Sequence, residues 1–203
     1  MFAKLLLGLV LFFGSSAFAN PKAGFNWKKY DHLDPQNLVP DRPLKRAVQF
    51  FELNQSKIKI KNYMVVIDYS KHSAHKRFFL INTTTGHVED LPVAHGKGSD
   101  ANHDGYAEKF SNVPGSKATS LGYYITDTTY FGDNGYSLMM DGHSPSNSNA
   151  RERAIVINGA AYVVDGLEKQ GRSWGCPALE SSEARRVINL IKNGALVYAW
   201  AGQ

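Results

Sequence analysis

The sequence predicts a mainly β domain with a sandwich or barrel-like core and a few short helices. Short runs of β-branched and aromatic residues recur along the chain, and clusters of Gly, Asn, Asp and Ser separate them. Only two segments space their apolar residues as a helix does. The length of 203 residues, with 43% hydrophobic and 20% charged content, fits one folded domain.

Residues 1–19 have the features of an export signal. Lys4 supplies the positive flank, residues 5–13 form an apolar core, and Ala17 and Ala19 fit the recognition pattern of a signal peptidase. We expect cleavage after Ala19 and a mature protein in the periplasm or cell envelope. The apolar core is too short for a stable span, so we expect no stable membrane anchor; an uncleaved anchor is the alternative.

An N-terminal arm precedes the domain itself. Residues 20–42 are rich in Pro, Asn, Asp and Lys and predict an extended arm, and residues 43–203 predict the domain. The domain opens with an amphipathic helix over residues 43–53, with Asp41 as a possible cap and Pro43 suited to the first turn.

The strands follow from short apolar runs bounded by turn residues. The strands expected at residues 77–81 and 88–94 form a hairpin around the turn at residues 82–86. A second helix is expected over residues 182–192, where apolar residues make a stripe. The predicted strands cover residues 63–69, 77–81, 88–94, 122–126, 137–140, 154–157, 161–164 and 196–200.

Charge and cysteine content narrow the classes of partner. The 23 Lys and Arg exceed the 18 Asp and Glu by five, yet they are scattered, so nucleic acid is not an expected partner. A modest positive excess favours attraction to an anionic envelope surface. The single cysteine excludes an intramolecular disulfide, a Cys₂ or Cys₄ zinc site and a redox pair. The oligomeric state is not specified by the sequence.

The lone cysteine is the candidate nucleophile. Cys176 stands between Gly175 and Pro177 in a turn, an arrangement that can expose a thiol and aim nearby amides at the group it attacks. A free thiol is only about 3% ionised at pH 7, so a nearby cation or base is needed, and Arg172 is a candidate cation. The alternative is a buried cysteine acting as a small hydrophobe.

Five segments in order resemble one family. Residues 93–100, 110–116, 120–124, 153–160 and 171–179 are together similar to the catalytic domain of murein L,D-transpeptidases, the YkuD-type cysteine enzymes. The last segment resembles the subgroup with a Ser-Trp-Gly-Cys-Pro signature, and its Ser, Gly and Cys fit the general family pattern. The resemblance implies a YkuD-like, mainly β fold and a partner in peptidoglycan stem peptides.

The resemblance also implies a two-step acyl transfer without a cofactor. Cys176 would attack the third residue of a stem peptide, expel D-alanine and hold a thioester, which a stem amine, a protein lysine or water would resolve. The amides of Gly175 and Cys176 are the expected oxyanion donors, and Ser173 is the expected orienting hydroxyl. The substrate-binding residues implied are Arg172, Trp174 and Gly159, although core packing is an alternative for Trp174.

Asn158 departs from the family pattern. The family has its histidine base at this position, before Gly159 and 18 residues before Cys176. An amide accepts no proton at useful pH, so general-base help, typically about 10² to 10⁴ in rate, is lost. Three hypotheses follow: a slowed enzyme, an enzyme with its base elsewhere, or an inactive module that binds peptidoglycan. Among the seven histidines His95 is the best substitute base, and a plain hydrogen bond to a backbone carbonyl is its alternative role.

Residues 100–105 imitate the first half of a calcium loop. They place oxygen ligands at alternate positions and end on a glycine. The twelfth position is Ser111 rather than a bidentate glutamate, and the same residues suit a tight surface turn. With no His and Cys cluster for zinc, no metal or cofactor is expected.

Overall fold

The computed structural model describes residues 25–202. The predicted export signal and the first part of the arm lie outside this range, so the signal, its cleavage and the compartment stay predictions. Within the described range, no helix is long and apolar enough to cross a membrane.

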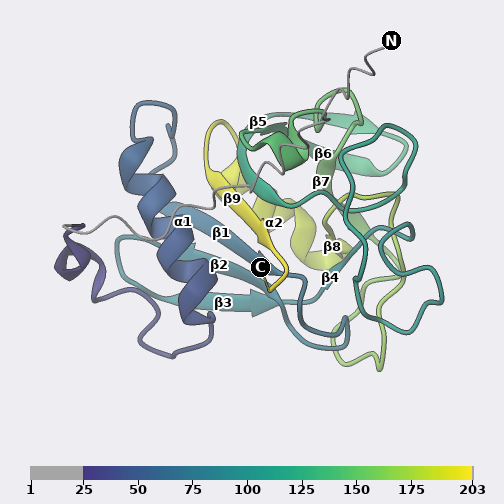
Figure 1. Ribbon diagram of the computed structural model, residues 1–203, viewed down its shortest axis with the longest axis horizontal. Helices are drawn as coiled ribbons and strands as arrows, with labels where there is room; N and C mark the ends of the chain where they lie inside the picture. The colour runs from purple at the N-terminus through teal and green to yellow at the C-terminus, as the bar shows by residue number, and fades with distance from the viewer. Residues whose placement is uncertain (1–24, 203) are drawn as a thin grey trace, which may run out of the picture.

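A single nine-stranded sheet curls into a nearly closed barrel (Figure 1), which confirms the mainly β, barrel-like prediction. The strand order is β3-β2-β1-β9-β5-β6-β7-β8-β4. The strands are β1 (Tyr63–Asp68), β2 (Phe78–Asn82), β3 (Val88–Leu91), β4 (Val93–Ala94), β5 (Gly122–Gly132), β6 (Gly135–Gly142), β7 (Val156–Ala160), β8 (Ala178–Glu180) and β9 (Leu196–Trp200).

The two edges of the sheet meet at a seam. The predicted strand over residues 88–94 is two strands, because Pro92 has no N–H for a ladder and β3 and β4 on either side of it pair with different neighbours. Arg77 bridges the seam: its backbone N–H donates to Leu91 O at 3.1 Å, and its Nε and Nη2 donate to Val93 O at 3.2 and 3.1 Å.

Both faces of β1 are buried, which explains its unbroken apolar sequence. Met64 and Val66 pack in the layer that includes α1 (Asp41–Leu53), and Val65 and Ile67 pack in the core that includes α2 (Ser181–Ile191). Figure 1 shows α1 in front of the sheet and α2 behind it. The two predicted helices therefore cover opposite faces.

The described part of the arm packs onto the α1 side. It forms a 3-10 turn, η1 (Trp27–Tyr30), and buries Leu33 and Val39 in the same apolar layer as α1. Asp34 holds the segment in shape, because its carboxylate accepts hydrogen bonds from the amides of Leu38 and Val39 at 2.9 and 2.8 Å. Residues 33–39 thus belong to the packed layer.

Two predicted details are wrong, and one strand was missed. Asp41 is the first residue of α1 and pairs with Lys45 at 2.8 Å, so it does not cap the helix. Residues 161–164 form a turn, in which the amide of Val163 donates to Ala160 O at 3.2 Å. The three-residue β8 was not predicted, since so short a strand carries no periodic signal.

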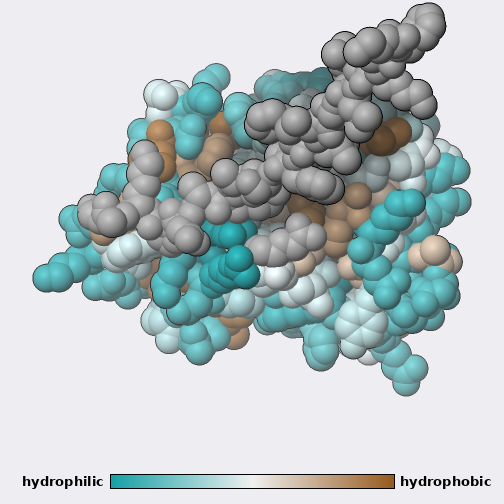
Figure 2. Space-filling model, viewed as in Figure 1, coloured by the Kyte–Doolittle hydropathy of each residue, from teal (hydrophilic) through white to brown (hydrophobic). Residues whose placement is uncertain are grey.

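Hydrophilic side chains cover much of the face in Figure 2, with scattered hydrophobic ones between them. Several basic residues are neutralised in ion pairs: Arg151 contacts Asp127 and Asp141 at 2.6 and 2.7 Å.

Gly86 should be required for docking of the arm. It has φ +80°, and a Cβ there would lie 1.8 Å from His32 O. We expect Gly86→Ala to lower the free energy of unfolding by about 2 to 4 kcal/mol, through left-handed backbone strain plus the clash. Gly115 has φ +76° but open space around it, so Gly115→Ala should cost only about 1 kcal/mol. Equal losses in urea unfolding would contradict the packing argument.

Candidate active site

Cys176 lies on the segment that leads into β8, next to β7. The residue is partly exposed, and its Sγ donates to Ala154 O at 3.6 Å. The amide of Val156 donates to the same sulfur. Ala154 has φ +51°, an uncommon conformation for a residue with a side chain, at the point where its carbonyl meets the thiol. The sulfur is thus held by the backbone that enters β7.

The surroundings of Cys176 favour its neutral form. Burial of the sulfur raises the pKa of the Cys176 thiol, and the Val156 amide and the charge of Arg153 act in the opposite direction. Because burial dominates, the resting group is a thiol hydrogen-bonded to Ala154 rather than a thiolate.

Arg153 is the cation beside the thiol. Its Nη1 donates to Ser111 O at 2.7 Å, and its Nη2 donates to Ala118 O at 2.6 Å and to Ser116 Oγ at 3.2 Å. These acceptors lie about 40 positions earlier in the chain, so only the folded structure shows why Arg153 is held there. Arg153 is the first residue of a segment that resembles the family, but the sequence alone indicates no role for it.

Arg172 does not take the position expected of it. Its Nη1 donates to the carbonyl of Asp100 and, at 3.4 Å, to that of Ala101, so it closes the loop beside β4. The expectation that Arg172 supplies the charge near Cys176 is wrong, since Arg153 does so. Substrate binding by Arg172 stays a prediction.

Ser173 organises the turn around the nucleophile. Its Oγ donates to Cys176 O at 2.7 Å and accepts from the Gly175 amide at 3.1 Å, which fits an orienting hydroxyl. The Gly175 N–H, an expected oxyanion donor, is therefore occupied by Ser173 in this arrangement. The Cys176 amide is the other expected donor.

Gly96 and Gly175 let three segments meet at the site. A Cβ at Gly96 would lie 2.8 Å from Gly175 N and 2.4 Å from Lys117 O. Gly175 has φ +121°, and a Cβ there would lie 2.7 Å from Ala118 O. Backbones pack directly against each other here, which only glycine permits.

Asn158 lies on β7, opposite Ala178 of β8 and so close to the Cys176 segment. The side chain is 3% exposed, and its Nδ2 donates to Gly159 O at 2.9 Å. It supplies no titrating group. Gly159 packs against α2, where a Cβ would lie 3.1 Å from the Cα of Ser181, so packing accounts for this glycine without a substrate.

His95 is fully buried between two charged groups. Its Nδ1 accepts from Arg77 Nη2 at 2.6 Å, and because arginine only donates, Nε2 carries the proton and donates to Asp100 Oδ2 at 3.0 Å. Burial and the neighbouring Arg77 lower the pKa of His95 to about 4, against the pull of Asp100. Both nitrogens are occupied away from Cys176, so the geometry gives no support to His95 as the base.

The calcium-like loop is closed by its own hydrogen bonds. The Asp100 carboxylate accepts from His95 at 3.0 Å, and it accepts from the amides of Asp104 and Gly105 at 3.1 Å each. In residues 25–202 no group of three or more His, Cys, Asp or Glu is placed to hold a metal ion. The tight surface turn is the reading that these contacts support.

Tyr69 carries an unpartnered hydroxyl. Its Oη is the one buried side-chain polar atom without a hydrogen-bond partner among the described residues. The Arg77 guanidinium lies 5.2 Å from the centre of its ring. Burial raises the pKa of Tyr69, as do the charges of Tyr124 and Cys176, so the hydroxyl stays protonated in the neighbourhood of the thiol. No sequence pattern marks such a group.

Trp174 is exposed, not a core residue. Its exposed fraction is 68%, so the core-packing interpretation is wrong. The Nζ atoms of Lys97 and Lys117 lie 5.8 and 4.7 Å from the centre of its ring.

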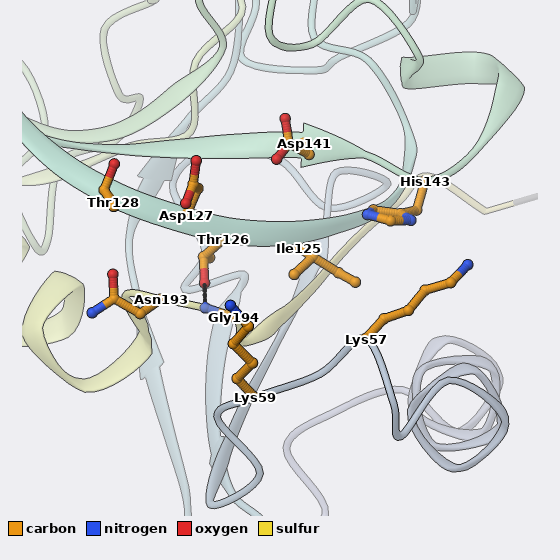
Figure 3. Close-up of a pocket in the computed structure, with 10 residues that line it drawn as sticks. All are labelled: Lys57, Lys59, Ile125, Thr126, Asp127, Thr128, Asp141, His143, Asn193 and Gly194. Carbon is orange, nitrogen blue, oxygen red and sulfur yellow. Dashed lines mark hydrogen bonds between the residues drawn. The ribbon is translucent and has the colours of Figure 1, made fainter.

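A hollow in the surface lies away from the cysteine. It has a volume of about 390 Å³ between β5, β6 and the loops at residues 57–59 and 193–194 (Figure 3). Its two carboxylates, Asp127 and Asp141, are bound by Arg151, and Cys176 does not line it. The hollow is therefore separate from the candidate site.

A barrel with one partly exposed cysteine residue, whose sulfur is held by backbone groups beside a partly buried arginine, has the components of a cysteine acyl-transfer site. Residues 36–200 match the L,D-transpeptidase catalytic domain, and the chain belongs to this family. No curated protein matches the chain.

Several solved structures resemble this chain. One is an L,D-transpeptidase from Mycobacterium tuberculosis H37Rv, at 15% identity and TM-score 0.44, covering 68% of this chain and 57% of that chain. The helical cell shape determining protein Pgp2 from Campylobacter jejuni is 13% identical with a TM-score of 0.45, and the match covers 70% of this chain and 48% of that chain. An L,D-transpeptidase from Mycobacterium smegmatis is 12% identical with a TM-score of 0.43, and the match covers 69% of this chain and 59% of that chain. The chain thus spans between 48% and 59% of these structures.

Removal of the unpartnered hydroxyl should not destabilise the protein. We expect Tyr69→Phe to leave the free energy of unfolding unchanged or raise it by up to about 1 kcal/mol, because no hydrogen bond is lost. Tyr124→Phe is the control: Tyr124 Oη donates to Ser120 O at 2.7 Å, so its loss should cost about 1 kcal/mol. Urea unfolding measures both, and an equal loss for Tyr69 would show that it has a partner.

His95 should make stability depend on pH. Its folded pKa of about 4 lies below the ordinary 6.5, so its contribution is present above pH 6.5 and is lost as the pH falls toward 4. We expect a loss of up to about 3 kcal/mol over this window in urea unfolding. His95→Gln keeps an acceptor for Arg77 and a donor for Asp100 without titrating, so its curve should be flatter. Parallel curves would refute the assignment. His143, whose pKa burial also lowers, contributes equally to both proteins.

Proposed function

We propose that this protein is a cysteine-dependent acyl transferase of peptidoglycan stem peptides, an L,D-transpeptidase or L,D-carboxypeptidase. The observation that carries the proposal is the geometry of Cys176: a partly exposed residue whose sulfur is held between Ala154 and Val156, beside Arg153, in a chain that belongs to the L,D-transpeptidase catalytic domain family. The substrate class follows from the family.

The reaction starts with loss of the thiol proton. The Cys176 thiolate then attacks the carbonyl of the third stem residue, and the C–N bond to the terminal D-alanine breaks as its amine takes up a proton. A thioester remains on Cys176. An amine from a second stem, a protein lysine or water attacks the thioester, which gives a crosslink, an attached stem or a trimmed stem and restores the thiol.

The groups around the sulfur divide the work of catalysis. Arg153 favours the thiolate electrostatically and the Val156 amide donates to it, while the Cys176 amide, next to the turn that Ser173 closes, is the candidate donor to a developing oxyanion. With Asn158 in place of an imidazole, the proton leaves through water. This favours a slowed enzyme among the three hypotheses, because no displaced base contacts the thiol among the described residues.

A non-catalytic peptidoglycan-binding module is the second candidate. Two observations favour it: Asn158 does not titrate, and burial raises the pKa of Cys176. In this case the loops around Cys176 hold a stem peptide without reacting.

The N-terminal sequence and the Ser-Trp-Gly-Cys-Pro signature complete the proposal. Residues 1–19 direct export, so the protein works in the periplasm or cell envelope, where peptidoglycan lies. The signature supports membership of the subgroup with tryptophan before the Gly-Cys pair.

Incubation with purified tetrapeptide muropeptides, followed by chromatography, separates these functions. Crosslinked products indicate transpeptidation, tripeptides with free D-alanine indicate carboxypeptidation, and unchanged substrate that co-elutes with protein supports the binding module. Cys176→Ala is the control for every product. The rate should keep rising with pH beyond the ordinary thiol value of 9, since burial raises the pKa of Cys176.

Restoring an imidazole should speed the first step. We expect Asn158→His to accelerate acylation by a carbapenem at least about tenfold, because the new side chain stands in the base position and raises the thiolate fraction. Whole-protein mass gives the rate of adduct formation. Asn158→Gln, which changes size without adding a base, is the matched control. If parent and both variants stay folded and none acylates, the catalytic proposal fails.

A further inference from the structure

Lys97, Trp174 and Lys117 form one cluster at the surface beside the nucleophile, with Lys97 and Trp174 exposed and Lys117 partly exposed. Trp174 stands two residues before Cys176 and is 68% exposed. The two ammonium groups lie 5.8 and 4.7 Å from the centre of its ring, within the range of cation–π contact. We call these three residues the lysine–tryptophan cluster.

The backbone fixes the three parts of the cluster relative to one another. The Lys97 amide donates to Ser173 O at 2.8 Å, and the Gly98 amide donates to Lys117 O at 2.9 Å. Gly96 forms a bridge with Ser173, and its close approach to Gly175 and to Lys117 leaves no room for a side chain. The two lysines therefore start from anchored backbone positions near Trp174, although their side chains are long.

Neither lysine has a negative partner in the described part of the chain, where no ion pair includes Lys97 or Lys117. By contrast Lys29, Lys45 and Lys76 each contact a carboxylate. An ammonium over an aromatic ring keeps N–H donors directed at solvent, so both lysines are available to an anion.

The proposed reaction brings an anion close to this position. The donor stem ends in D-alanine, whose carboxylate lies one residue beyond the carbonyl that Cys176 attacks. Trp174 is two residues before Cys176 in the chain, and a Cβ on Gly96, the neighbour of Lys97, would lie 2.8 Å from Gly175 N, so the cluster starts from backbone that adjoins the nucleophile. Two ammonium groups suit a carboxylate, which accepts through both oxygens.

We propose that the lysine–tryptophan cluster binds the C-terminal carboxylate of the donor stem peptide. Lys97 and Lys117 donate to the carboxylate, and the Trp174 ring restricts both side chains to conformations that converge on it. The inference rests on the proposed function, since it takes its ligand from that reaction. It makes this cluster a selector of donors that end in a free acid.

Calorimetry on the full chain with Cys176→Ala tests the inference without turnover. The probes are a synthetic tetrapeptide stem with a free C-terminus and the same peptide with a C-terminal amide. We expect the free acid to bind about tenfold more tightly than the amide. With Lys97→Gln and Lys117→Gln together, the ratio should fall to within about twofold. Lys28→Gln with Lys61→Gln removes the same charge from exposed positions outside the cluster and should keep the tenfold ratio.

Substitution of Trp174 tests the role of the ring. Trp174→Phe retains an aromatic face and should keep most of the preference for the acid, whereas Trp174→Leu should lose most of it. Thermal unfolding of each variant reports whether the loop is intact.

The outcomes separate the cluster from the reaction. An acid-to-amide ratio that is the same in the Lys97 and Lys117 variant as in the control, or no binding of either peptide, overturns the inference. If the parent enzyme processes tetrapeptides with no preference for the acid, the proposed function stands and the cluster fails. If the parent never turns over but the acid preference depends on Lys97 and Lys117, the cluster stands as part of a binding module.

Discussion

The Arg77 guanidinium joins the two edges of the barrel and positions the residues around it. It is fully buried and donates to Val93 O, to Lys71 O at 2.7 Å and to His95 Nδ1, and it lies over the ring of Tyr69. Burial lowers the pKa of Arg77 to about 10, so the group remains charged at neutral pH. Without it the buried Val93 O and His95 Nδ1 would lose their donor, and the seam between β3 and β4 would lose its bridge.

Much of the fold could be predicted from the sequence because its signals are local. The strand over residues 63–69 and the helix over residues 182–192 follow from apolar runs and spacing, and both agree with the structure to within about one residue. The split at Pro92 was missed, because strand pairing on either side depends on partners far along the chain. The segment at residues 161–164 has an apolar sequence that imitates a strand, but only Val163 is buried and the segment forms no ladder.

The candidate site was less accessible to sequence reasoning. Cys176 and Ser173 were found because a lone cysteine in a glycine turn is a local signal. Arg153 was missed as the cation, since its place depends on carbonyls in a distant loop. Nothing in the sequence shows that His95 contacts Arg77 and Asp100, because only the closed barrel brings these residues together. Spacing along the chain identifies reactive groups, but it does not say which of them face each other.

The raised pKa of Cys176 has a consequence for the lifetime of the protein. Peroxides and disulfides react with thiolates, so a sulfur that rests as a thiol against a carbonyl is oxidised slowly. The chain has no second cysteine to recover a sulfenic acid as an internal disulfide. Chemical durability and catalytic speed therefore oppose each other at this one atom, and the asparagine at position 158 shifts the balance toward durability.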